Sequence, residues 1–154
     1  MPNKRDKFNN ISKPLSSKEP AKFAEALVYH QKGKLAEAQE IYVDILKTQP
    51  KHFDALHLLG VIAHQTKNNQ RAVELIGKAI KVNSGVAEAH YNLGNALGEL
   101  GKRDEAISSY NQAIHLKSDY FEAYNNLGNT LNGLGKFKEA IPYFTQAIQL
   151  KRGY

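Results

Sequence analysis

Residues 19–154 repeat one pattern of small and apolar residues every 34 positions, without an insertion. When Glu19 opens the first repeat, the twentieth position is alanine in all four repeats, at Ala38, Ala72, Ala106 and Ala140. The eighth position is always small, at Ala26, Gly60, Gly94 and Gly128. A period of this length is typical of solenoid proteins, in which each repeat buries its apolar face only by stacking on its neighbours.

Each repeat has the pattern of two amphipathic helices of roughly 12–14 residues, joined near the fifteenth position. Gly33, Gly101 and Gly135 occupy that position and suit the left-handed backbone that commonly follows a helix. The second repeat has Lys67-Asn68-Asn69 instead, and we expect an asparagine to adopt the left-handed conformation there. The small residues at positions eight and twenty are expected to let the two helices pack closely.

This arrangement resembles the tetratricopeptide repeat (TPR) family. The resemblance implies an all-α fold, a right-handed TPR superhelix of four helix-turn-helix repeats at 19–52, 53–86, 87–120 and 121–154. Segments such as EAHYNLGNAL (88–97) are also similar to the N-terminal TPR region of bacterial O-linked N-acetylglucosamine-transferase-like proteins. Residues 1–18 precede the repeats as a basic, polar leader, which we expect to be partly disordered.

The net charge of +6 belongs mostly to the leader. Residues 1–18 contain five basic residues and one acidic residue, so the repeats themselves are only slightly basic. The basic balance is therefore poor support for a nucleic-acid surface. The chain has no cysteine, and no run approaches the ~18 apolar residues of a membrane span. These features fit a cytoplasmic protein without disulfide bonds.

The resemblance implies that positions two, five, six, nine, twelve and thirteen of each first helix line a concave groove. None of these positions carries lysine or arginine, and position two is acidic in three repeats, at Asp54, Glu88 and Glu122. Nucleic-acid binding needs cations against phosphates, so the groove predicts a neutral-to-basic polypeptide partner instead. The alternative is that the acids only keep an exposed face soluble.

Asparagines recur among the groove positions, and a primary amide can bond both the N–H and the C=O of an extended peptide. They resemble the asparagine ladder that holds substrate polypeptide in O-linked N-acetylglucosamine transferases. The alternative is that they bond neighbouring helices and fix the stacking of the repeats. The candidate peptide-binding residues are His57, His64, Glu88, Tyr91, Asn92, Asn95, Glu122, Asn125, Asn126, Asn129 and Asn132.

No catalytic, cofactor or metal motif is present, so we expect a non-enzymatic scaffold. His57 and His64 are seven residues apart, and His30 lies one repeat before His64. This spacing is too wide for ideal pairwise ligation of a metal, which favours ordinary polar roles. The glycine-rich stretch from Gly94 to Lys102 lacks the spacing of a phosphate-binding loop.

The last repeat would end in an apolar helix with no polar capping helix after it. We expect this chain to be a fragment of a longer protein, or another molecule to cover that end. Two further roles therefore stay open: self-association through the C-terminal helix, and substrate recognition as one arm of a longer glycosyltransferase-like enzyme. A third possibility is that the leader occupies the groove, since its lysines complement an acidic channel.

Overall fold

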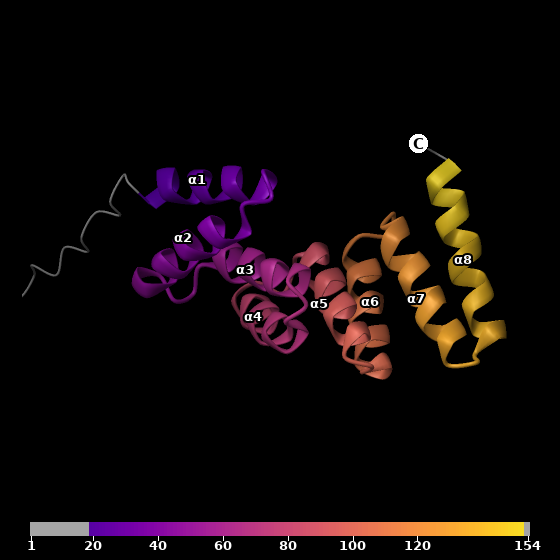
Figure 1. The fold of residues 1–154 in the computed structure, drawn as a ribbon. Coiled ribbons are helices and arrows are strands. Elements are labelled where there is room, and N and C mark those ends of the chain that lie inside the picture. The colour runs from indigo at the N-terminus through magenta and orange to yellow at the C-terminus, as the bar shows by residue number, and fades with distance from the viewer. Residues whose placement is uncertain (1–18, 153–154) are drawn as a thin grey trace, which may run out of the picture.

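The computed structural model describes residues 19–152, and the expected leader lies outside the described residues, as do positions 153 and 154. This part of the chain forms eight helices and no strand, arranged as four successive hairpins (Figure 1). The helices are α1 (Glu19–Gln31), α2 (Leu35–Thr48), α3 (Phe53–Gln65), α4 (Asn69–Val82), α5 (Ala87–Glu99), α6 (Arg103–Leu116), α7 (Phe121–Gly133) and α8 (Phe137–Arg152). The predicted all-α solenoid of four repeats is confirmed.

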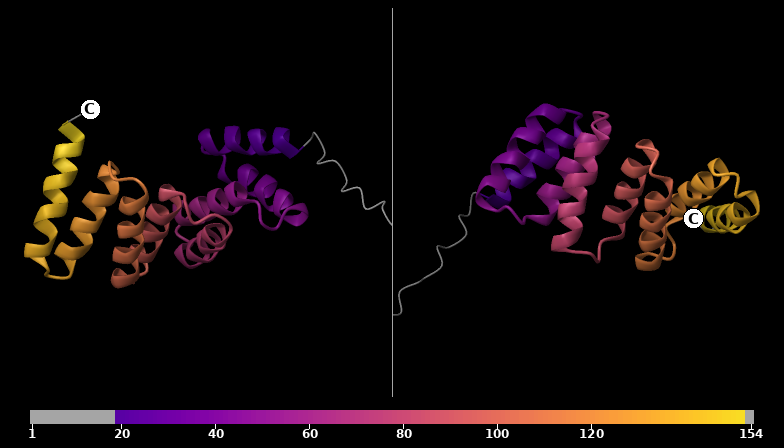
Figure 2. Two further views of the ribbon diagram at one scale, coloured as in Figure 1. Left: turned by 180° about the vertical axis from the view of Figure 1, so that it is seen from behind. Right: turned by 90° about the horizontal axis from the view of Figure 1, so that it is seen from below.

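The hairpins follow one another along an extended, turning array, so that α1 and α8 lie at opposite ends (Figure 2). The two helices of each hairpin pack together, and each second helix also packs on the first helix of the next repeat. The buried side chains form two apolar clusters, one centred on the first two repeats and one on the last two. Val73 and Leu93 touch both clusters and make the core continuous.

The small residues at the eighth position allow the close packing within each hairpin. A Cβ atom on Gly94 would lie 2.6 Å from Cε1 of Tyr110, and one on Gly128 would lie 2.8 Å from Cε1 of Phe144. The alanines at the twentieth position are buried in every repeat. The predicted contact between the paired helices is therefore confirmed, and the residue at position twenty-four is the side chain that fills the space above the glycine.

The turn within each hairpin contains one residue with left-handed backbone. Gly33, Gly101 and Gly135 have φ angles of 72°, 74° and 75°, as predicted. In the second repeat the left-handed residue is Lys67, with φ of 65°, so the expectation of an asparagine was wrong. The hairpin geometry fixes the left-handed residue at position fifteen whatever its side chain is. The neighbouring Asn68 instead caps α4, because its side chain accepts a hydrogen bond from the backbone N–H of Arg71 (3.2 Å).

We expect Lys67→Gly to raise the free energy of unfolding by about 1 kcal/mol, because glycine adopts the left-handed conformation without a Cβ penalty. Lys67→Ala is the matched control, since it removes the charged side chain but keeps the Cβ. Urea unfolding followed by circular dichroism measures both. Equal shifts in the two variants would show that backbone strain at this position is not the cause.

Candidate functional site: the face of the first helices

The first helices of successive repeats lie on the inner side of the array. Helix α3 contacts α5 and α5 contacts α7, and no pair of second helices in the described part of the chain makes an equally extensive contact. The polar residues that the sequence singles out are carried by α3, α5 and α7. These three helices therefore present one shared surface, which we call the inner face.

Two of the candidate asparagines connect neighbouring first helices. The amide nitrogen of Asn92 donates to Nε2 of His57 in the preceding repeat (3.0 Å). The amide nitrogen of Asn126 donates to Oη of Tyr91 (3.2 Å) and to Oδ1 of Asn95 (2.9 Å). These contacts match the alternative in which asparagines fix the stacking of the repeats. Peptide binding by Asn92 and Asn126 stays a prediction.

The remaining asparagines differ in exposure. Asn95 is half-buried and accepts from both Asn126 and the hydroxyl of Tyr110 (2.9 Å). Asn125, Asn129 and Asn132 are exposed, and their spacing places them along one side of α7. The candidate asparagines whose side chains face the solvent therefore lie on α7, which is the first helix of the fourth repeat.

The histidines lie within the scaffold. His57 is buried, and its ring packs 5.7 Å from that of Phe53, centroid to centroid. Burial lowers the pKa of His57, while Glu88 and Asp54 oppose that shift. A neutral imidazole has a nitrogen that can accept the Asn92 hydrogen bond. His57 therefore supports the inner face from beneath, and direct peptide binding by His57 stays a prediction.

His64 contacts the start of the second helix in its own hairpin, with Nδ1 lying 2.7 Å from Oδ1 of Asn69. His30 pairs with the next repeat, its Nε2 lying 3.2 Å from Oε1 of Gln65. Residues 19–152 contain no group of three or more histidines or acids that could hold a metal ion. These histidines thus have polar contacts within the repeat array.

Two of the acids at position two, Glu88 and Glu122, act on one aromatic residue, Tyr120. Burial raises the pKa of Tyr120, and Glu88, Tyr91 and Glu122 raise it further. The rings of Tyr91 and Tyr120 lie 5.0 Å apart, and Nζ of Lys117 lies 4.9 Å from the centre of the Tyr120 ring. The junction of the third and fourth repeats is therefore an aromatic pair between two carboxylates, which already attracts one ammonium group.

Tyr120 was not among the residues predicted from sequence, because it precedes α7 rather than lying in a first helix. A signal for it exists in the sequence at the thirty-fourth position, which carries an aromatic ring in the first, third and fourth repeats but is Val86 in the second. In the first repeat this position is His52, whose ring lies 5.3 Å from that of Phe23. Tyr120 makes the equivalent contact with Tyr91, so an aromatic residue at position thirty-four covers the one at position five.

The inner face continues onto α1, where His30 contacts Gln65 of α3, and it is apolar at that end. Phe23 and Leu27 of α1 and Leu58 and Val61 of α3 are half-buried. Phe23 packs against Tyr42, with 5.8 Å between ring centres. The face therefore changes from apolar side chains in the first two repeats to amides and carboxylates in the last two.

The hydroxyl of Tyr42 shows the consequence of that change. Tyr110 occupies the equivalent position and donates to Asn95, but Leu27 replaces the asparagine in the first repeat. The Tyr42 hydroxyl is buried without a hydrogen-bond partner among the described residues. Burial is the main cause that raises the pKa of each tyrosine to about 12.

We expect Tyr42→Phe to leave stability unchanged or raise it by up to about 1 kcal/mol, because it removes an unsatisfied buried hydroxyl. Tyr110→Phe should lower stability by about 1 kcal/mol, because Asn95 loses a donor. Thermal and urea unfolding of the two variants measures the difference. A loss of stability in Tyr42→Phe as large as that in Tyr110→Phe would contradict this assignment.

Comparisons with known proteins identify the repeats. Three models described as tetratricopeptide repeats match residues 23–86, 99–135 and 121–154. No curated protein sequence matches the chain significantly. None of the helices among residues 19–152 has the length and apolarity needed to cross a membrane.

Solved structures share the same architecture. The chain is similar to a crystal structure of MamA (TM-score 0.83, 25% identity, covering 88% of this chain and 79% of that one). MamA from Desulfovibrio magneticus RS-1 is similar in fold (TM-score 0.82, 21% identity, covering 88% and 76%). A mutant O-GlcNAc transferase from Thermobaculum terrenum matches over 79% of this chain but only 23% of its own (TM-score 0.73, 28% identity). The 34-residue period, the four stacked hairpins and the matching family models together show that this chain belongs to the tetratricopeptide repeat family.

Proposed function

We propose that the chain is a non-enzymatic scaffold whose inner face binds an extended, neutral-to-basic polypeptide segment. The observation that carries this proposal is the composition of the face. Helix α7 carries exposed amides and the acid Glu122, α5 carries the acid Glu88 at the equivalent position, and no lysine or arginine stands at a groove position. Amides can bond a peptide backbone of any sequence, and carboxylates favour positive side chains.

The exposed amides that remain for a ligand are Asn125, Asn129 and Asn132. Each hydrogen bond contributes about 1 kcal/mol, whereas association costs roughly 4–15 kcal/mol. The amides alone therefore give weak binding. Burial of apolar side chains against Phe23, Leu27 and Leu58 would supply the rest, so the preferred segment combines an apolar part with a basic part.

A random 12-residue peptide library, sorted by net charge, tests this proposal. We expect captured peptides to be enriched in lysine or arginine, and their binding to weaken as salt is raised. Asn129→Ala/Asn132→Ala and Glu88→Gln/Glu122→Gln should each weaken the binding of a captured peptide at least tenfold. The matched control is Asn111→Ala, which removes an exposed amide from the second helix α6.

If the Asn111→Ala control and both double variants bind the peptide with equal affinity and keep their helicity, the inner face is not the peptide-binding surface. Single-stranded DNA is the second probe, and retention of DNA in place of peptide would contradict the predicted class of partner.

A second candidate rests on the similarity to the O-GlcNAc transferase from Thermobaculum terrenum. In this candidate the repeats are the substrate-recognition arm of a longer glycosyltransferase-like enzyme, and the inner face presents a polypeptide to a catalytic domain. The reading frame after Tyr154 tests it, because a catalytic domain must be encoded there or in a partner gene.

A further inference from the structure

The junction of the third and fourth repeats carries two phenol rings and two carboxylates. The rings of Tyr91 and Tyr120 lie 5.0 Å apart, centroid to centroid, with 40° between their planes. Glu88 stands three residues before Tyr91 on α5, a spacing that places both on one side of the helix, and Glu122 follows Tyr120 in the first turn of α7. Both rings and Glu122 are half-buried, and Glu88 is exposed. We call these four residues the Tyr120 site, and solvent reaches all of them.

Of the three junctions within residues 19–152, this one alone has both rings and both acids. At the first junction the rings of Phe23 and His52 pack together, but Pro20 takes the place of the first acid. At the second junction Val86 replaces the ring at position thirty-four, and His57 at position five is buried. The Tyr120 site is therefore a feature of one junction and not a consequence of the packing that the repeats share.

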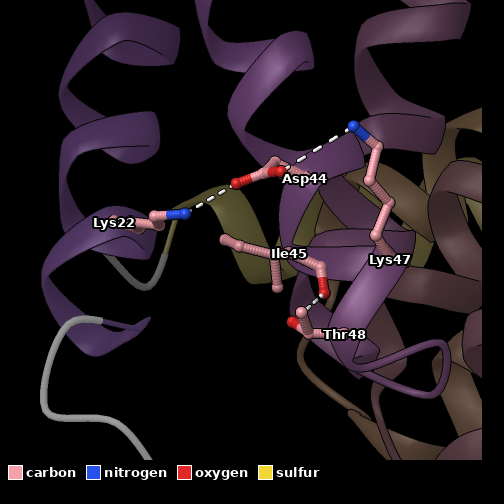
Figure 3. Close-up of polar contacts among 5 residues, drawn as sticks. All are labelled: Lys22, Asp44, Ile45, Lys47 and Thr48. Carbon is pink, nitrogen blue, oxygen red and sulfur yellow. Dashed lines mark hydrogen bonds and ion pairs between the residues drawn. The ribbon is translucent and has the colours of Figure 1, made fainter.

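The chain places an ammonium group of its own at the Tyr120 site. Lys117 lies at the end of α6, is exposed, and its Nζ lies 4.9 Å from the centre of the Tyr120 ring. Two lysines of the first hairpin are held differently, since Lys22 and Lys47 both pair with the carboxylate of Asp44, at 2.6 Å and 3.8 Å (Figure 3). An exposed ammonium group over a ring gains roughly a two- to fivefold factor in binding. Lys117 therefore marks where a cation sits, and a stronger ligand can displace it.

The electric field at the Tyr120 ring selects the sign of the ligand. Burial raises the pKa of the Tyr120 hydroxyl, and Glu88, Tyr91 and Glu122 raise it further. The two carboxylates thus oppose negative charge at this place, and the same field stabilises a positive group. The face of a phenol ring attracts cations as well. Rings and acids therefore favour an ammonium group over a carboxylate, a phosphate or a neutral side chain.

We propose that the Tyr120 site binds the ammonium group of a lysine in the polypeptide on the inner face, and that this lysine displaces Lys117 from the Tyr120 ring. This assignment rests on the proposed function, and it specifies which side chain the segment carries and where that side chain lies. The exposed amides of α7 extend from Asn125 to Asn132, and Asn132 stands about 18 Å along the helix axis from Tyr120. An extended chain spans that length in about six residues. The lysine therefore lies at one end of the bound segment, and the amides contact the rest.

Replacement of each lysine of a captured peptide by norleucine tests the proposal, since norleucine has a side chain of similar length without the charge. We expect one such replacement to weaken binding about tenfold, because the ring loses a partly desolvated ammonium group. With the Tyr120→Leu chain that replacement should have no greater effect than replacement of any other lysine. Tyr120→Phe is the matched control, because it keeps the ring and should distinguish the two peptides as the parent chain does.

Lys117→Met should raise the affinity for the lysine peptide about threefold, because the competing ammonium group is removed. It should leave the affinity for the norleucine peptide nearly unchanged, because that peptide does not compete for the ring. Lys47→Met is the matched control, since it removes the same charge from a lysine that pairs with Asp44 instead. Both lysines are exposed, so these two variants decide the question even if circular dichroism shows that Tyr120→Leu has lost its helices.

An equal gain for both peptides from Lys117→Met, or a tenfold loss from norleucine that persists with Tyr120→Leu, would overturn the proposal. The failure of this proposal differs from the failure of the proposed function. If the amide and acid double variants weaken peptide binding while Tyr120→Leu and Lys117→Met leave it unaltered, the inner face still binds the peptide and only the Tyr120 site is wrong.

A small probe tests the site without a captured peptide. Nα-acetyl-lysine N-methylamide, added to the Lys117→Met chain, should shift the NMR signals of the Tyr91 and Tyr120 rings, whereas the norleucine analogue should not. Such shifts would support the site even if the library yields no peptide and the proposed function fails. Identical spectra with the two probes would overturn the site.

Discussion

Gly94→Leu should lower the free energy of unfolding by about 3 kcal/mol, the upper end of the cost of overpacking a core. Even the first added carbon would lie 2.6 Å from Cε1 and 2.8 Å from Cδ1 of Tyr110. The Tyr110 ring is held in place, since its hydroxyl donates to Asn95 and its ring packs 6.1 Å from that of Tyr91, centroid to centroid. The leucine side chain therefore has to separate α5 from α6.

Substitutions of different size at Gly94 and at the nearby Gly98 test whether overpacking causes the loss of stability. Gly94→Ala should cost much less than Gly94→Leu, because the first repeat accommodates Ala26 beside Tyr42 at the equivalent positions. Gly98→Leu is the control on the same helix, where a Cβ would meet only the hydroxyl of Tyr110, at 3.9 Å. Leucine is the better helix former, so we expect Gly98→Leu to be neutral or stabilising by up to ~1 kcal/mol. Equal losses at Gly94 and Gly98 in urea unfolding would contradict the packing argument.

The repeat period made the fold predictable because it reports packing that recurs at the same position. Gly60, Gly94 and Gly128 recur because each lies under the side chain at position twenty-four of its own hairpin. The turn of the second repeat could not be predicted from residue preference. Asparagine tolerates left-handed backbone better than lysine does, but chain geometry places Lys67 at the left-handed position.

The partners of the asparagines were harder to predict, because they depend on how neighbouring repeats are rotated. The structure shows a rule that a sequence can reveal. Three hydrogen bonds between successive first helices join residues 35 positions apart: His30 with Gln65, His57 with Asn92, and Tyr91 with Asn126. A fourth joins Asn95 and Asn126, which are 31 positions apart. Polar residues separated by one repeat plus one residue thus indicate contacts between repeats, whereas the 34-residue period alone does not.

Asn126→Ala should lower the free energy of unfolding by about 2 kcal/mol, because two donated hydrogen bonds of about 1 kcal/mol each are lost. The substitution leaves Oη of Tyr91 and Oδ1 of Asn95 without their donor from α7. Stability of a solenoid depends on contacts between neighbouring repeats, so the loss should be concentrated in the last hairpin. Amide hydrogen exchange should accelerate in α7 and α8 and stay nearly unchanged in α1 and α2.

Asn125→Ala is the control for this prediction, since Asn125 is exposed on the same helix and the substitution should change stability by less than about 0.5 kcal/mol. The pair also separates the two roles of the asparagines. If Asn126 links the repeats, Asn126→Ala loosens the last hairpin in the absence of any peptide, while Asn125→Ala affects only peptide affinity. An Asn126→Ala variant as stable as Asn125→Ala, but deficient in peptide binding, would reverse that assignment and make Asn126 a direct ligand contact.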